Sequence, residues 1–147
     1  MPTLTDILGS GPKRQQVVDD ACRVLDDEVA DKGGISGLAI KAAFGVVKGV
    51  KPGFVREVVD ALLDDFLKCL DPLYQEAVSR GVKPGAHLQA NAGRVADALL
   101  AVTDGKAARA QRPMIKSTYE KLRPTAKKHV EAAAPRLAGL LDRHAVV

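Results

Sequence analysis

The last third of the sequence contains the pattern that most restricts the fold. Apolar residues recur there every three or four positions, at Ile115, Tyr119, Leu122, Ala126, Val130, Ala133, Leu137 and Leu140. This spacing keeps all of them on one side of an α-helix, and we call them the apolar stripe. Pro113, Pro124 and Pro135 are eleven residues apart, almost three helical turns, so they also share one side, roughly opposite the stripe.

Proline inside a helix removes a backbone hydrogen bond and bends the helix. Prolines on the solvent side would therefore curve one long C-terminal helix around a core. The unbroken register of the apolar stripe favours this over three short helices that each start at a proline. Eleven-residue repeats with prolines also occur in helices that lie on lipid surfaces, but this stripe is narrow and rich in alanine, which favours packing against the protein itself.

The rest of the chain is also predicted to be helical, because no segment of useful length alternates apolar and polar residues as a half-buried strand would. We expect an all-α fold: a single compact bundle of six or seven helices over residues 1–147, with the long proline-bent helix at its C-terminal end. Residues 35–50 are apolar nearly all round, which is typical of a helix at the centre of a bundle. Asp71–Pro72 predicts a new helix start, and residues 86–102 are predicted to form one helix.

The five residues GVKPG occur twice, at 49–53 and 81–85, each time after a basic residue. A basic residue followed by Gly is typical of a helix end, and Pro sets the entry of the next helix, so each copy predicts a helix stop and restart. If the chain reverses at Asp71–Pro72, the two loops lie at the same end of the bundle. Lys51 and Lys83 would then converge beside helix N-termini as a small-anion site, which we keep as an alternative.

Charge is distributed unevenly along the chain. Residues 1–80 carry 10 Lys and Arg against 13 Asp and Glu, and residues 81–147 carry 12 against 5. The basic C-terminal half predicts contact with an acidic protein or another polyanion, through Lys116, Lys121, Arg123, Lys127 and Lys128. These cations spread around the predicted helix, and aromatic residues make up only 3% of the chain, so sequence-specific nucleic-acid readout is not expected.

No motif in the sequence indicates catalysis. The three histidines, His87, His129 and His144, have no metal-ligand spacing, and no local Ser-His-Asp or Cys-His pattern is present. We therefore expect a non-enzymatic binding or scaffold protein without cofactor, metal or catalytic residues. The alternatives are association with a lipid or granule surface through the eleven-residue repeats and small-anion binding at the GVKPG loops.

No apolar run is long enough to cross a membrane, and residues 1–20 lack the order of a secretory signal, so we expect a cytoplasmic protein. Helical domains of this size often form homo-oligomers through a surplus apolar stripe.

Several stretches resemble a group of small bacterial proteins of unknown function. They are LTDIL at Leu4–Leu8, GGISGLAIKAAFGVVKGVKPG at Gly33–Gly53 and VADALLAVTD at Val95–Asp104, together with KLR and PRLAGLLDRHA near the end. The resemblance runs along almost the whole chain. It implies a self-contained bacterial cytosolic helical domain and carries over no functional residues.

Overall fold

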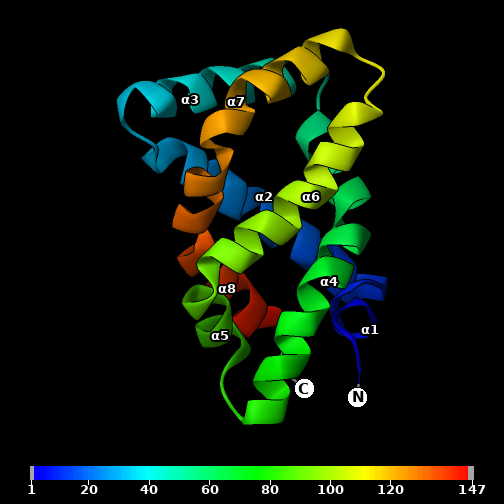
Figure 1. Ribbon diagram of the computed structural model, residues 1–147. Helices are drawn as coiled ribbons and strands as arrows, with labels where there is room; N and C mark the ends of the chain where they lie inside the picture. The colour runs from blue at the N-terminus through cyan, green and yellow to red at the C-terminus, as the bar shows by residue number, and fades with distance from the viewer. Residues whose placement is uncertain (1, 146–147) are drawn as a thin grey trace.

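The computed structural model describes residues 2–145, and within these residues the fold is all-helical, as predicted (Figure 1). Residues 2–145 contain eight helices, more than the six or seven expected. Their bounds are α1 (Leu4–Leu8), α2 (Gly11–Asp31), α3 (Gly34–Lys48), α4 (Phe54–Arg80), α5 (Pro84–Ala90), α6 (Ala92–Ala108), α7 (Pro113–Ala132) and α8 (Ala134–His144). Part of the excess arises because the segment predicted as one helix over 86–102 breaks at Asn91, between α5 and α6.

The longest helix, α4, runs along one side of the molecule for 27 residues, or about 40 Å. It passes through Pro72, so the predicted helix start at Asp71–Pro72 is wrong. Pro72 is exposed, which places its ring on the solvent side, where the missing N–H is tolerated best. Asp71 does satisfy a helix N-terminus, but of a different helix: its Oδ1 accepts a hydrogen bond from the backbone N–H of Leu4, the first residue of α1, at 2.9 Å.

The two GVKPG loops are helix stops and restarts, as predicted, but their backbones differ. The second loop closes α4 with Gly81 in the left-handed region (φ +68°) and the Val82 N–H donating to the Ala77 carbonyl at 3.0 Å. In the first loop Gly49 stays right-handed (φ −75°), and Gly53, just before α4, takes the positive φ of +77°. The same five residues therefore build two different turns.

The C-terminal third forms two helices where one was predicted. The chain stays helical through Pro124, and the break comes at Ala133, one residue before α8, which has Pro135 in its first turn. All three prolines are exposed, whereas every member of the apolar stripe is partly buried. The predicted orientation, with stripe inward and prolines outward, is confirmed. The stripe is therefore covered by the protein itself, which leaves the alternative of lipid association through the eleven-residue repeats without a free apolar face.

Helix α3 was predicted at the centre of the bundle, and this is wrong. It lies across one end of the molecule and packs on α2, α4 and α7 (Figure 1). Only Gly37 and Ala43 are buried in it, while Ile35 and Leu38 are 89% and 69% exposed. Because α4 is uninterrupted, α5 and α6 pack against it, α8 packs on α5 and α2, and α3 is left at the other end.

The most buried side chains come from α1, α2, α4, α5, α6 and α8. This cluster contains Leu4, Leu8, Val17, Val18, Leu63, Leu67, Leu73, Tyr74, Leu88, Val95 and Leu141. Both the first and the last helix of the described chain contribute to it, so the core joins segments from the whole length of the sequence. None of the helices within residues 2–145 combines the length and the apolar character needed to cross a membrane.

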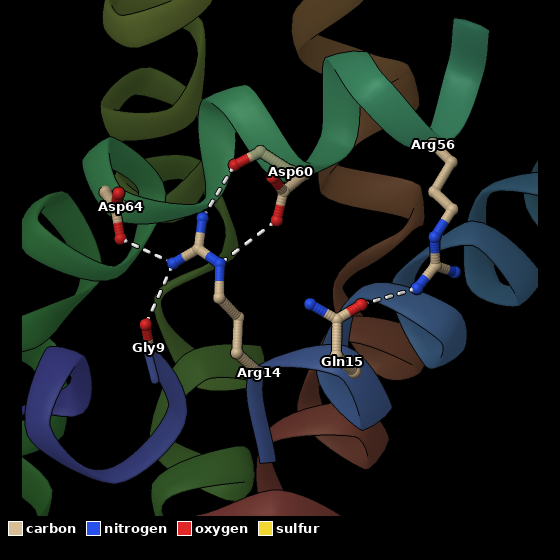
Figure 2. Close-up of polar contacts among 6 residues, drawn as sticks. All are labelled: Gly9, Arg14, Gln15, Arg56, Asp60 and Asp64. Atoms are coloured by element: carbon tan, nitrogen blue, oxygen red, sulfur yellow. Dashed lines mark hydrogen bonds and ion pairs between the residues drawn. The ribbon is translucent and has the colours of Figure 1, made fainter. Parts of the chain in front are cut away.

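One arginine fastens α1, α2 and α4 together (Figure 2). The Arg14 guanidinium donates to Oδ1 of Asp60 at 3.0 Å, to Oδ1 of Asp64 at 2.8 Å, and to the carbonyl oxygens of Gly9 and Asp60, each at 2.9 Å. Its side chain is only 18% exposed. The planar fork of arginine suits several acceptors held in fixed positions. Sequence reasoning did not single out Arg14, because its two acidic partners lie 46 and 50 residues away.

Candidate functional site

A cavity of about 360 Å³ lies between the helices and is partly enclosed. All eight helices contribute to its wall. Representative lining residues are Leu8 of α1, Val24 of α2, Ile40 of α3, Phe66 of α4, Leu99 of α6 and Leu137 of α8. Apart from Glu28, Lys32 and His129, every lining side chain is apolar. A space bounded in this way attracts apolar molecules and holds water poorly.

The wall is built from helix faces that follow the helical period. On α2 the lining residues Val17, Ala21, Val24 and Glu28 are separated by three or four positions. On α7 and α8 they include Val130 and later members of the apolar stripe. The apolar stripe therefore predicted which face of α7 and α8 turns inward. The sequence did not predict that the inward faces stop short of one another, because the gap depends on how eight helices are arranged.

The size of the cavity can be compared with that of known ligand sites. Ligand pockets in proteins typically have volumes of about 300–1,000 Å³, and an apolar cavity of about 150 Å³ is enough to bind benzene. The cavity therefore has the dimensions of a ligand site.

The polar residues on the wall gather in one place, and we call Glu28, Lys32, His129 and the adjacent Arg136 the polar edge. Glu28 is 8% exposed and receives two cations: Lys32 Nζ lies 2.9 Å from its Oε2, and Arg136 Nη1 lies 2.7 Å from its Oε1. Lys32 Nζ also donates to the carbonyl oxygen of His129 at 3.2 Å. Arg136 makes a second ion pair with Asp31. A buried carboxylate with two cationic partners is tolerated because each of its oxygens is satisfied.

His129 is the unsatisfied member of the polar edge. Its Nε2 is enclosed by the protein and has no hydrogen-bond partner among the described residues. Burial lowers the pKa of His129, and the positive charges of Lys32 and Lys128 lower it further. The ring is therefore neutral at pH 7. An enclosed ring nitrogen without a partner is uncommon in proteins and is often associated with function.

Sequence reasoning did not identify the polar edge as a site. Two signals for it exist in the sequence: Glu28 and Lys32 are four residues apart on one helix, and His129 and Arg136 are seven apart. Neither signal shows that the two pairs meet, because about 100 residues separate them.

The predicted anion site of Lys51 and Lys83 is not formed. The two lysines lie in the loops at opposite ends of α4, which separates them by roughly the 40 Å length of that helix. The prediction depended on a chain reversal at Asp71–Pro72, which does not occur. Lys51 instead pairs with Glu57 at 3.1 Å.

The five cations predicted to meet an acidic partner are in two different situations. Arg123 pairs with Asp104 at 2.9 Å, and Lys127 pairs with Asp97 at 3.1 Å. Lys116, Lys121 and Lys128 are exposed and make no ion pair within residues 2–145. The uneven charge of the chain is also partly balanced within the molecule, because bases of the C-terminal half pair with acids of the N-terminal half, in Arg136–Glu28, Arg143–Asp20 and Lys106–Asp65.

Among the residues that the structure describes, no three His, Cys, Asp or Glu side chains are grouped so that they could hold a metal ion.

Comparison with known proteins gave one match. No curated protein matches the chain, and no solved structure matches it. The model of a family of unknown function, DUF6918, matches residues 4–145. This span covers nearly the whole sequence, and it agrees with the resemblance to uncharacterised proteins described above. The chain therefore belongs to the DUF6918 family.

Proposed function

We propose that the protein is a non-enzymatic binding protein that holds the aliphatic chain of a small molecule in its interior cavity. The observation that carries this proposal is a space of about 360 Å³ whose wall is apolar except at the polar edge. A ligand chain that fills this space recovers the packing energy that an unfilled cavity forgoes. The protein would then be most stable in its loaded form.

The polar edge supports a ligand with a hydrogen-bond-accepting head, such as the carboxylate of a fatty acid. The Lys32 ammonium has three N–H donors, and its partners Glu28 and the His129 carbonyl occupy two of them. The third donor is available to an oxygen of the ligand. The chain of the ligand would extend from there along Val130 and Leu137, away from the charged groups.

Binding can be measured by fluorescence titration with cis-parinaric acid, followed by displacement with palmitate. We expect saturable binding to the wild-type protein. Ala21 lines the cavity, so Ala21→Leu and the bulkier Ala21→Phe should reduce the affinity progressively, because each fills part of the same space. Ala21→Leu should also raise the melting temperature of the unliganded protein, since cavity filling commonly stabilises by about 0.5–2 kcal/mol.

Ala101→Leu is the matched control, because Ala101 is exposed on α6 and does not line the cavity. Its affinity for cis-parinaric acid should equal that of the wild type. The proposal is wrong if wild-type protein shows no saturable binding, or if the two Ala21 variants bind as tightly as the control.

A second candidate function is binding of an acidic protein or another polyanion, as expected from the sequence. It is supported by Lys116, Lys121 and Lys128, which are exposed on α7 without an ion pair in the described part of the chain. Affinity purification from native extract, compared between wild type and the variant with all three lysines changed to Glu, tests it. Partners retained equally by both proteins would rule this candidate out.

A further inference from the structure

Helix α3 exposes an apolar face that the fold leaves uncovered. Ile35 and Leu38 are 89% and 69% exposed, and Ala39 and Ala42 beside them are exposed as well. Positions 35, 38, 39 and 42 are separated by three and four residues, so they form one continuous face of the helix. The opposite side of α3 is the packed one, with Ala43 buried and Ile40 lining the cavity. We call the face formed by residues 35, 38, 39 and 42 the α3 ridge.

Helix α3 carries two lysines, Lys41 and Lys48, and no acidic residue, and residues 32–56 contain no Asp or Glu. Apart from Lys41, the cations of this stretch pair with acids of neighbouring segments: Lys32 with Glu28, Lys48 with Asp26, Lys51 with Glu57 and Arg56 with Asp19. Lys41 is exposed and makes no ion pair with the described residues, and at 100° per residue it flanks the ridge. An exposed apolar face bordered by lysines is the pattern of a helix that lies in the surface of an anionic bilayer.

We propose that the α3 ridge docks the protein on the surface of a membrane that contains anionic lipids. This inference deepens the proposed function. Docking would allow an acyl chain to pass between the bilayer and the cavity, and that role rests on the proposed function. Helix α3 is placed for that purpose, because its outer side carries the ridge and its inner side contributes Ile40 to the cavity wall. In Figure 1 it lies across one end of the molecule, and the exposure of Ile35 and Leu38 shows that the described residues leave this side of it uncovered.

A second copy of the chain fits the ridge less well than a bilayer does. A stable protein interface buries about 800 Å² on each partner, and the ridge offers only two large side chains, Ile35 and Leu38. Two copies meeting through α3 would also bring their Lys41 side chains together without an acid on the helix to neutralise them. Anionic lipid head groups supply the opposite charge, at a surface with room for every lysine around the ridge.

Flotation of the full-length protein with vesicles tests the inference. Wild-type protein should float with vesicles of phosphatidylcholine and phosphatidylglycerol and remain at the bottom with phosphatidylcholine alone. The double variant Ile35→Ser/Leu38→Ser should lose flotation, because withdrawing each side chain from an apolar phase weakens partitioning by about tenfold or more. Lys41→Glu should weaken flotation by a smaller factor, and added salt should weaken it in the wild type.

The matched control is Val78→Ser/Val82→Ser, which changes two exposed apolar side chains at the opposite end of α4. It should float like the wild type. Circular dichroism and thermal melting should show that both double variants fold, since all four positions are exposed. The inference is overturned if the wild type does not float, if the α3 double variant floats as well as the control, or if light scattering finds a dimer that the α3 double variant abolishes.

Titration of the same proteins with cis-parinaric acid separates this inference from the proposed function. The α3 double variant should bind cis-parinaric acid as the wild type does, because Ile35 and Leu38 do not line the cavity. Ligand binding without flotation would reject membrane docking and leave the binding function in place. Flotation without ligand binding would retain a docking surface and reject its role in acyl transfer.

Discussion

The two ends of the molecule are packed very differently. At one end, which we call the dense end, α1 and α5 contact α4, α8 packs on α5, and Leu4, Ala77 and Leu88 are at most 1% exposed. At the other end, which we call the open end, α3 packs on α7, and α7 buries no residue completely. The short helices α1 and α5 thus bury more of their apolar surface than the strongly apolar α3. The burial of a helix in this protein therefore depends on how many other helices surround it. The hydrophobicity of the helix alone does not determine its burial.

The largest expected difference between the ends concerns leucine truncation. Leu88→Ala at the dense end should lower the free energy of unfolding by about 2–5 kcal/mol, because Leu88 is fully buried and its truncation enlarges the cavity that it lines. Leu38→Ala at the open end should change it by no more than about 0.5 kcal/mol. Urea unfolding followed by circular dichroism measures both. Similar values for the two variants would show that the packing difference does not exist in solution.

A smaller effect is expected for two arginines that Figure 2 shows side by side. Arg14→Lys should cost about 1.5–3 kcal/mol, because lysine cannot reach all the acceptors that the guanidinium joins across α1, α2 and α4. Arg56 is 43% exposed, pairs with Asp19 and Gln15, and lies one turn into α4, next to the loop that follows α3. Arg56→Lys should therefore lower the free energy of unfolding clearly less than Arg14→Lys does in the same urea measurement. Equal losses would mean that the network around Arg14 contributes no more than an exposed ion pair.

A Gly→Ala substitution should change the stability in opposite directions at the two ends. A methyl group on Gly85 would overlap the carboxylate of Asp142, which accepts the Gly85 N–H at 2.9 Å, so Gly85→Ala should destabilise by about 1–2 kcal/mol. Gly45 lies within α3 and has no atom near the position of an added methyl, so Gly45→Ala should stabilise by about 0.5–1 kcal/mol through its helix propensity. Melting temperatures of the two variants should shift in opposite directions. A loss of stability from Gly45→Ala would show that α3 is packed more closely than its exposure indicates.

The smallest expected effect is a difference in pH response. The lowered pKa of His129 means that the unfolded chain takes up a proton near pH 6.5 while the folded protein does not. Stability should therefore fall as the pH drops below about 6.5, and His129→Phe should remove this dependence. At the dense end, burial opposes the ionisation of Asp20, but hydrogen bonds from Arg143 and His144 outweigh it and lower the pKa. Its contribution should persist until the pH falls below the ordinary aspartate value of 3.8, so a wild-type stability curve that is flat from pH 7.5 to 5 would contradict the assignment to His129.

Local patterns in the sequence predicted much of the fold. The apolar stripe, the outward prolines and the two loop positions each depend on residues within a few turns of one another, and the structure confirms them. Pro72 and α3 were misplaced because their environment is set by distant segments. Asp71 was predicted to cap the helix that follows it. Its carboxylate instead accepts a hydrogen bond from the N–H of Leu4 in α1, 67 residues earlier. The centrality of α3 was inferred from composition, which does not report how many helices surround it.

The candidate site could not be predicted from the sequence for the same reason. Its wall takes side chains from every helix, and its polar edge joins Glu28 to Arg136 across 108 residues. Local spacing indicates which face of each helix is apolar. It does not indicate whether opposing faces meet in close contact or leave a space, because that depends on how the helices are positioned relative to one another.

The shared placement of α1 and α8 in one cluster has a consequence for synthesis of the protein. Leu4 and Leu8 leave the ribosome long before Leu141, and they cannot be fully covered until Leu141 has followed. The helices between them must therefore all be translated before this interior can close, and the nascent chain exposes apolar side chains throughout that time. Such chains depend on fast completion or on chaperones to avoid aggregation.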